Sequence, residues 1–330
     1  MKLASFVKNG QKEDDPALGV MLDEDSLLDL LPAAALYMRE EVKEKEPHRQ
    51  ASQLIPTDMT AFLKKGEAAL SLARRTMEHF KIQRRKKDPE EIKGLEGEPL
   101  IFPLATVALK APVPRPGKII AMGLNFYDHV SEIKTSVPEF PLGFLKIPSA
   151  LRGQDEPIPY PRSIKQLDYE IELAIIIGKK GKDIPPEKAF EYIAGYTIFN
   201  DISAREIQAK EMKKRFLLLG KNFDAFAPMG PYLVTREEIE TPQDLDMELR
   251  INDEQEPRQK SSTKNMVFKI PELISYWSQM TLEPGDIIAS GTPGGIALFH
   301  QPDPAAWFLK PGDIMEARIQ GLGVLRNSIV

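Results

Sequence analysis

The sequence predicts an α+β protein rich in β-strands, with a small α+β N-terminal domain and a larger domain formed by a β-rich roll or barrel-like sheet. Two helix-like segments precede residue 85, and short strand-like segments dominate after residue 118. Between them, three closely spaced prolines in APVPRPGK (111–118) hold the chain extended. A length of 330 residues fits two domains, and we expect them to comprise residues 1–112 and 113–330.

The first domain is predicted to begin with short strands in residues 1–30 and to continue with helices at 32–50 and 58–84. Apolar residues of the second helix recur at close to the 3.6-residue period of an amphipathic helix. The charged run REEVKEKE in the first helix is interpreted as a solvent-exposed face. The larger domain is predicted to contain helices at 185–195, 203–216 and 271–280 and the strands KIIAMGL, LDYEIELAIIIG, AGYTIFND, LDMELRIN, GDIIASG and GDIMEARI.

Composition narrows the classes of function. Hydrophobic residues make up 42% of the chain, charged residues make up 28%, the net charge is −5, and no basic stripe is interleaved with aromatic residues. Nucleic acid is therefore not an expected partner. No apolar run approaches the roughly 20 residues of a membrane helix, and the acidic N-terminal segment does not resemble a signal peptide. We expect a cytoplasmic protein with no membrane partner.

A metal site in this chain is expected to be rich in oxygen ligands. There is no cysteine, which excludes disulfides, thiolate ligands and a cysteine nucleophile. The four histidines, His48, His79, His129 and His300, lie in unrelated surroundings. Carboxylates are abundant, and their oxygens suit Mg²⁺ or Mn²⁺, with Ca²⁺ as a substitute.

The segment DYEIEL (168–173) is the most informative stretch of the sequence. Side chains alternate along a strand, so Glu170 and Glu172 point to one face, and the apolar run that follows predicts a buried strand. Buried carboxylates are unfavourable unless they are paired or bind a metal ion, and one cation between the two glutamates meets that condition. The alternative is an exposed strand end at which both glutamates meet lysines in solvent.

Asp201 is the third candidate ligand. It ends the apolar segment IFND, 29 residues after Glu172, and a helix at 185–195 would return the chain alongside the first strand. Asp201 alternatively caps the helix that begins with SAREIQ, and one side chain can do both.

His129 and Glu132, in GLNFYDHVSEI, are candidates for acid–base chemistry. Residues three apart meet on a helix, and a carboxylate bound to one ring nitrogen makes the other a stronger base toward water. The alternative is an incidental surface ion pair. Lys221 is either solvated or contacts an oxygen that becomes negative in the reaction. The segment GTPGG (291–295) lacks the lysine of a P-loop, so we interpret it as a tight turn near a ligand.

Six segments occur in an order that resembles the fumarylacetoacetate hydrolase family: GLNFYDHVSE, LDYEIELA, GYTIFNDISAREIQ, GKNFDAFAPMGPYLVT, SGTPGG, and LKPGD followed by GLG. The resemblance covers residues 115–330, and residues 1–110 resemble the small N-terminal domain of many bacterial members. It implies a fumarylacetoacetase-like catalytic domain with a mixed β-roll, and a homodimer.

The resemblance also implies roles for individual residues. It assigns Glu170, Glu172 and Asp201 to binding Mg²⁺ or Mn²⁺. It assigns the pair His129 and Glu132 to orienting or deprotonating water, on a segment that often closes over the ligand as a lid. Further residues match positions that contact the substrate or steady the site: Lys146, Arg205, Gln208, Lys221 and Thr292.

The chain departs from the family pattern at three places. Glu206 stands where the family usually has an aspartate. Met122 stands where some members have a fourth carboxylate ligand, so water would fill that coordination position. The segment HQPDPAAWF (300–308) resembles a modified loop that shapes the substrate pocket.

The resemblance implies a divalent-metal-dependent hydrolase that cleaves a C–C bond in 2,4-dioxo acids, such as acylpyruvates and fumarylacetoacetate-like compounds, through a metal-stabilised enolate. His129 with Glu132 would activate water, and Lys221 would stabilise the oxyanion. One alternative is a decarboxylase or isomerase of 2-oxo acids or of dicarboxylic acids from aromatic ring cleavage. Another is a non-catalytic metabolite-binding protein on the same scaffold, against which the candidate base argues.

Overall fold

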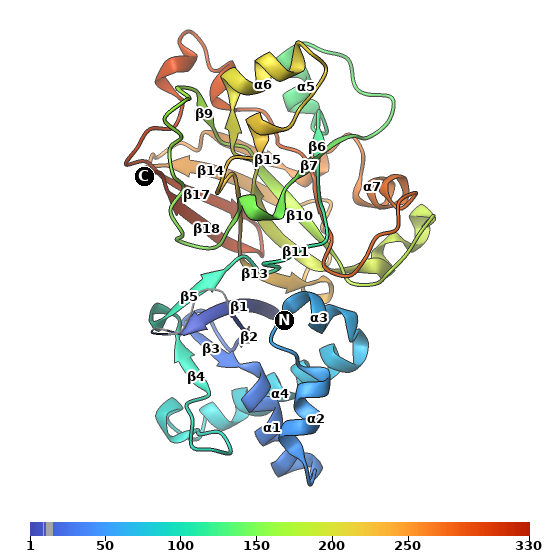
Figure 1. Cartoon of the computed structure of the whole chain (residues 1–330), viewed down its shortest axis with the longest axis vertical. Helices are drawn as coiled ribbons and strands as arrows, with labels where there is room; N and C mark the ends of the chain where they lie inside the picture. Colours follow the sequence, from blue (N-terminus) through green and yellow to red (C-terminus); the bar gives the residue numbers. More distant parts are fainter. Residues whose placement is uncertain (9, 11–15) are drawn as a thin grey trace.

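A twelve-stranded sheet organises the molecule. The computed structural model describes residues 1–8, 10 and 16–330, and Figure 1 shows the sheet running from the N-terminal region into the larger part of the chain. Its order is β4-β3-β2-β1-β13-β11-β10-β16-β6-β7, with β5 beside β1 and β8 beside β13. The strands are β1 (Lys2–Lys8), β2 (Ala17–Met21), β3 (Ser26–Asp29), β4 (Ile101–Pro103), β5 (Val107–Lys110), β6 (Ile119–Gly123), β7 (Leu142–Lys146), β8 (Leu151–Arg152), β10 (Ile171–Ile177), β11 (Ile193–Asn200), β13 (Ala227–Thr235) and β16 (Ile287–Ala289).

Strand β10 lies near the middle of this sheet and is buried along its whole length. Its side chains alternate between two apolar cores, so that Leu173 and Ile175 belong to one core and Ala174 and Ile176 to the other. It pairs antiparallel with β11, which is equally buried. The prediction of a strand buried on both faces is confirmed.

A second sheet covers one face of the large one and shares the first of these cores. Its order is β15-β14-β17-β18. The strands are β14 (Asp246–Ile251), β15 (Gln259–Ser262), β17 (Ile314–Ile319) and β18 (Gly323–Ser328). A separate ribbon joins β9 (Leu167–Asp168) to β12 (Ser203–Ala204) and leads directly into the acidic segment of the chain. The predicted α+β, strand-rich fold is confirmed.

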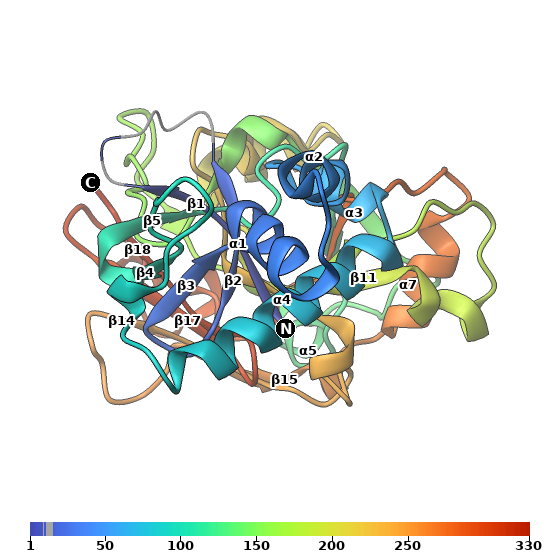
Figure 2. The ribbon, with the colours of Figure 1, turned by 90° about the horizontal axis from the view of Figure 1, so that it is seen from below.

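Helices of the N-terminal region pack on the other face of the sheet, as Figure 2 shows from below. They are α1 (Leu30–Tyr37), α2 (Pro47–Leu54), α3 (Met59–Lys64) and α4 (Glu67–Arg84). The larger part adds α5 (Tyr127–Ile133), α6 (Arg205–Met212) and α7 (Ile270–Trp277). Within the described part of the chain, every helix is too short or too polar to cross a membrane.

Both predicted N-terminal helices are interrupted. After α1 a π-helical turn spans Met38–Val42 and ends at Lys43, whose φ is 61°, and α2 restarts with Pro47 in its first turn. The helix expected at 58–84 breaks at Gly66, whose φ of 64° suits glycine. The helix expected at 185–195 is a 3₁₀ helix, Pro186–Tyr192. Other 3₁₀ turns are Pro89–Glu91, Leu104–Thr106, Pro148–Ala150, Leu219–Lys221, Arg236–Glu238, Thr263–Asn265, Ala297–Phe299 and Pro304–Ala306.

The N-terminal region is joined to the larger part through the sheet itself. Strand β1 pairs antiparallel with β13, with Leu3 opposite Leu233, and β5 pairs antiparallel with the second half of β1. A domain boundary after residue 112 stays a prediction, because backbone hydrogen bonds run across the two proposed domains.

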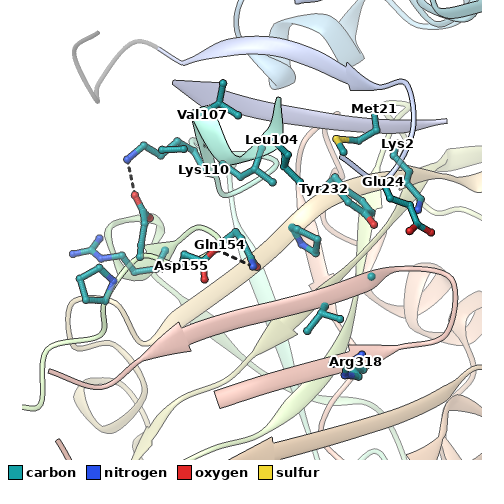
Figure 3. Close-up of a pocket in the computed structure, with 18 of the residues that line it drawn as sticks. Lys2, Met21, Glu24, Leu104, Val107, Lys110, Gln154, Asp155, Tyr232 and Arg318 are labelled. Carbon is teal, nitrogen blue, oxygen red and sulfur yellow. Dashed lines mark hydrogen bonds and ion pairs between the residues drawn. The ribbon is translucent and has the colours of Figure 1, made fainter. Parts of the chain in front are cut away.

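A cleft of about 1130 Å³ lies between the N-terminal strands and the hairpin β17–β18, and Figure 3 shows its lining. An ion pair joins Lys110 to Glu156 at 2.6 Å, and the Lys2 ammonium lies 4.9 Å from the centre of the Tyr232 ring. The predicted site residues, all of which are described, lie outside this cleft. The predicted site is therefore elsewhere in the molecule.

Close packing of β11 against β13 predicts a specific effect on stability. A Cβ atom at Gly195 would lie 2.1 Å from the carbonyl oxygen of Val234, so Gly195→Ala must push the two strands apart. We expect the free energy of unfolding, measured by urea denaturation, to fall by about 1–3 kcal/mol. The control is Gly123→Ala, where a Cβ meets nothing within 4 Å and the expected change is within about 0.5 kcal/mol. Equal effects of the two substitutions would contradict this packing.

Candidate active site

Glu170, Glu172 and Asp201 converge where β10 begins and β11 ends. Each offers an oxygen within 4.8 Å of the others. The backbone N–H of Asp201 donates to the carbonyl of Glu170 at 2.8 Å, which fixes the two segments side by side. The alternative of a solvent-exposed strand end is wrong, because Glu170 is 6% exposed and Glu172 is fully buried. Asp201 does not cap α6 either, because the N-cap residue is Ala204 and no side chain caps that helix.

Three buried cations lie against this acidic cluster. The Lys221 ammonium is 2.6 Å from an oxygen of Asp201 and 2.8 Å from one of Glu170. The other oxygen of Asp201 pairs with Lys146 at 2.6 Å, and the other oxygen of Glu170 pairs with Arg205 at 2.6 Å. Each of these two carboxylates is therefore held from both sides.

The electrostatic consequence differs between the carboxylates. Burial raises the pKa of Glu170, but Lys221 and Arg205 outweigh burial and hold that pKa at about 2. Burial raises the pKa of Glu172 well above its usual value, and the neighbouring carboxylates of Asp201 and Glu170 raise it further. Glu172 is thus the member of the cluster that lacks a cation of its own.

Glu172 shows that the cluster fits a divalent cation. One of its oxygens accepts a hydrogen bond from the backbone N–H of Gly291 at 2.9 Å. The other is buried without a hydrogen-bond partner among the described residues. A cation shared with Glu170 and Asp201 would pair this oxygen and offset the repulsion, and three carboxylates suit Mg²⁺ or Mn²⁺.

His129 and Glu132 lie on α5, and their side chains meet there, as the three-residue spacing predicts. This pair is the candidate dyad. Nδ1 of His129 is 3.2 Å from one carboxylate oxygen of Glu132. The other carboxylate oxygen of Glu132 accepts a hydrogen bond from the backbone N–H of Gly295 at 3.0 Å. Asp128 accepts from the N–H of Gly294 at 3.3 Å. The glycine turn therefore anchors α5. Because Glu132 engages Nδ1, Nε2 is the ring atom that can take a proton.

A cavity of about 550 Å³ lies beneath α5 and α6, which lie at the top of the molecule in Figure 1. Its polar wall is formed by six predicted residues, His129, Glu170, Arg205, Gln208, Lys221 and Thr292, with Thr135 beside them. Glu132, Glu172 and Asp201 do not line it, and neither does Lys146. Its ammonium lies behind Asp201 and also donates to backbone carbonyls, including that of Phe226 at 2.7 Å.

Sequence reasoning missed Asp168, which links two walls of the site. Its carboxylate accepts from Nε of Arg205 at 2.8 Å and from the backbone N–H groups of Ala297 and Leu298 at 2.8 and 3.1 Å. A signal was present, because Asp168 stands two residues before Glu170, on the same alternation that identified the glutamates.

Gln259 is a second supporting residue that was missed. Its carbonyl oxygen accepts from the N–H of Ile171 at 3.0 Å. Its amide donates to the hydroxyl of Thr292 at 2.9 Å and to the carbonyl of Pro293 at 3.0 Å. It thus ties the acidic strand to the glycine turn, and no sequence pattern marks it.

The departures from the family pattern have structural explanations. The longer arm of Glu206 reaches the backbone N–H groups of residues 165 and 166, at 2.8 and 3.1 Å. Met122 lines the cavity, and its sulfur accepts from the Trp277 indole at 3.2 Å.

The expectation that residues 300–308 shape the pocket is wrong. The rings of His300 and Trp307 stack 3.8 Å apart, and the cavity wall is formed by residues 296, 298 and 299 instead.

Comparisons with known proteins agree with this fold and site. The sequence model described as Fumarylacetoacetate (FAA) hydrolase C-terminal matches residues 118–330. The chain is 40% identical over 277 residues to the mitochondrial oxaloacetate tautomerase Fahd2a of Rattus norvegicus, covering 84% of this chain and 80% of that protein.

Two solved structures are similar over the whole chain. The 5-carboxymethyl-2-hydroxymuconate delta-isomerase of Mycobacterium smegmatis superposes with a TM-score of 0.67 at 28% identity, covering 100% of this chain and 99% of that one. The maleylpyruvate hydrolase of Sphingobium sp. SYK-6, in complex with manganese(II) and pyruvate, superposes with a TM-score of 0.69 at 27% identity, with the same coverage.

The fold and the site define an enzyme of α+β architecture whose mixed sheet carries a buried carboxylate cluster suited to a divalent metal. The chain belongs to the fumarylacetoacetate hydrolase family. Its relatives are hydrolases, isomerases and tautomerases, so it is an enzyme, and the alternative of a non-catalytic binding protein is set aside.

Glu172→Gln tests the metal assignment. We expect Mn²⁺ affinity, measured by calorimetry, to fall by more than about tenfold, because one ligand loses its charge. Without metal, the folded wild type retains a proton on Glu172 that the unfolded chain releases, so stability should fall as the pH rises above 4.5. Glu172→Gln should weaken this dependence.

Glu206→Gln serves as the control for the metal test, because Glu206 binds only backbone N–H groups outside the cluster. It should leave Mn²⁺ affinity unchanged. Undiminished affinity in Glu172→Gln would show that the three carboxylates do not share an ion.

Proposed function

We propose that the chain interconverts the keto and enol forms of a 2-oxo acid by moving a proton at carbon 3. The observation that carries this proposal is that His129, the candidate base paired with Glu132, and Glu170, a member of the acidic cluster, line one cavity. Support also comes from a relative, 40% identical over 84% of the chain, that is named an oxaloacetate tautomerase.

Glu170, Glu172 and Asp201 would hold the metal, Mg²⁺ or Mn²⁺. When bound, the cation would supply Lewis-acid stabilisation of negative charge on the 2-oxo oxygen. A neighbour with manganese and pyruvate supports a 2-oxo acid as the ligand class.

The remaining roles in the reaction belong to other side chains of the site. His129 would accept and return the proton through Nε2, while Glu132 fixes its ring. Lys221 bridges Glu170 and Asp201 and so keeps both carboxylates oriented. We propose Arg205, Gln208 and Thr292 as the substrate contacts and Lys146 as a support for Asp201.

A second candidate is hydrolysis of a C–C bond in a 2,4-dioxo acid. It is favoured by the dyad, which can take a proton from water, and by a structural neighbour that is a maleylpyruvate hydrolase. Decarboxylation of a 2-oxo acid with a second carboxylate on carbon 3 would draw on the same stabilised charge, because loss of that carboxylate as CO₂ leaves negative charge on the 2-oxo oxygen.

One assay distinguishes these reactions. The Mn²⁺-loaded protein is incubated in D₂O with pyruvate, oxaloacetate and 2,4-dioxopentanoate, and products are followed by NMR and mass spectrometry. Deuterium at carbon 3 without cleavage supports keto–enol conversion. Release of acetate from the dioxo acid supports hydrolysis, and absence of metal-dependent exchange or cleavage overturns the proposal.

His129→Ala should slow carbon-3 exchange by about 10²–10⁴-fold, the usual contribution of a positioned acid–base group. Mn²⁺ affinity should be retained, because His129 is not a member of the carboxylate cluster. Rates come from NMR exchange and affinity from calorimetry. An unchanged exchange rate in a metal-binding variant would remove His129 from the mechanism.

We also propose that the protein is a homodimer. Strand β7 ends the large sheet, and exposed apolar side chains gather there and on the segment after α6, including Leu145, Ile147, Phe216 and Leu218. Asn222 joins the two segments by donating to the carbonyls of Leu145 and Leu218 at 3.1 and 2.8 Å. An apolar patch beside an edge strand is typical of a protein interface. A cytoplasmic location stays a prediction, and the tautomerase relative is named as mitochondrial.

Leu145→Asp should convert a dimer to a monomer, because it places a charge in the middle of this patch. The matched control is Ile82→Asp on α4, since the two side chains are similarly exposed, at 55% and 51%. Light scattering coupled to size-exclusion chromatography gives the mass. A monomeric wild type, or a dimer that survives Leu145→Asp, would rule out this interface.

A further inference from the structure

The cavity has an apolar wall in addition to its polar groups. This wall is contributed by α5, β7, the segment after α6 and the segment that follows the glycine turn, through Ile133, Phe144, Leu217, Leu298 and Phe299. We infer that the substrate is a 2-oxo acid with a single carboxylate, next to the oxo group, and an uncharged apolar tail that lies along this wall. The inference rests on the proposed function and specifies its substrate class, and it separates this chain from the relative named for oxaloacetate, which has two carboxylates.

No basic group of the described cavity wall is left to pair with a second carboxylate. The lining contains three basic side chains, those of His129, Arg205 and Lys221. Arg205 is held by Asp168 at 2.8 Å and by Glu170 at 2.6 Å. Lys221 is held by the acidic cluster and His129 by its partner on α5. A carboxylate on the tail would therefore lose water without gaining an ion pair.

The charge of the buried groups gives an independent argument. At the acidic cluster they comprise three cations and four carboxylates, namely Lys146, Arg205 and Lys221 with Asp168, Glu170, Glu172 and Asp201. With Glu172 ionised, as a metal ligand would be, their net charge is one negative unit, so a divalent cation would leave one positive unit. One substrate carboxylate neutralises that charge, whereas two would restore a negative charge inside a poorly solvated site.

The test uses two ligands of equal shape. 2-Oxoglutarate and 5-methyl-2-oxohexanoate differ in that the distal carboxylate of the first is replaced by an isopropyl group in the second. Calorimetry on the Mn²⁺-loaded protein should show the second ligand binding at least about tenfold more tightly. In the series pyruvate, 2-oxobutanoate and 2-oxopentanoate, affinity should rise by up to about fourfold per added methylene.

A variant tests the position of the tail. Ala209 lines the cavity on α6, four residues after Arg205 and hence on the same helix face. Ala209→Arg adds a cation to the wall at an exposed helix position that tolerates a long side chain, and it should reverse the preference in favour of 2-oxoglutarate. Ala209→Met, the uncharged control of similar length, should keep the preference for 5-methyl-2-oxohexanoate.

The outcomes separate this inference from the proposed function. If pyruvate undergoes metal-dependent exchange but the wild type binds 2-oxoglutarate more tightly, the apolar-tail inference fails and the proposed function stands. If no 2-oxo acid exchanges or binds, the proposed function fails first. The inference is supported if Ala209→Arg binds 2-oxoglutarate more tightly while Ala209→Met still binds 5-methyl-2-oxohexanoate more tightly.

Discussion

Three carboxylates buried within 4.8 Å of one another are the constraint around which the larger part of the chain is arranged. Their repulsion is unfavourable in a poorly solvated interior, and it is offset by cations from three separate elements: β7 supplies Lys146, α6 supplies Arg205, and the 3₁₀ turn Leu219–Lys221 supplies Lys221. Each cationic side chain reaches the acidic cluster only when the element that carries it is folded in its native position. The cluster therefore depends on the fold being complete, and the raised pKa of Glu172 marks the charge that the protein alone leaves uncompensated.

The sheet makes this arrangement rigid. Strands β10 and β11 are packed on both faces, so the acidic side chains at their ends are carried by backbone that has little room to move. The base sits on a different support. Helix α5 is attached to the glycine turn by hydrogen bonds from Gly294 and Gly295 to its acidic side chains. A rigid carboxylate cluster and a candidate base on a short helix would together allow one site to hold a divalent cation and to transfer a proton, as the proposed function requires.

Much of this site could be predicted from sequence because its pattern is local. The alternation of Glu170 and Glu172 along a strand and the three-residue spacing of His129 and Glu132 each fix a geometry within a few residues. The strand-rich fold followed from similar short patterns. Gln259 could not be found, because it is 88 residues from its backbone partner Ile171 and only the folded second sheet brings them together. The helix break at Gly66 was missed because the apolar period of 58–84 continues across it, although φ at Gly66 is 64°. The break at Lys43, where φ is 61°, lies in a charged run that carries no signal for a helix end.

Asp168 has a consequence for how this scaffold can diversify. A single carboxylate holds both the guanidinium at the acidic cluster and the backbone of residues 297–298 on the apolar wall. Substitutions that reshape residues 297–298 to admit a new ligand would also disturb the contact of Asp168 with Arg205 at the acidic cluster. Such substitutions are therefore expected to be unfavourable. Surface positions of α6, such as Ala209, are free of this linkage. Evolutionary or laboratory selection for altered specificity should therefore accumulate its first tolerated substitutions on that helix.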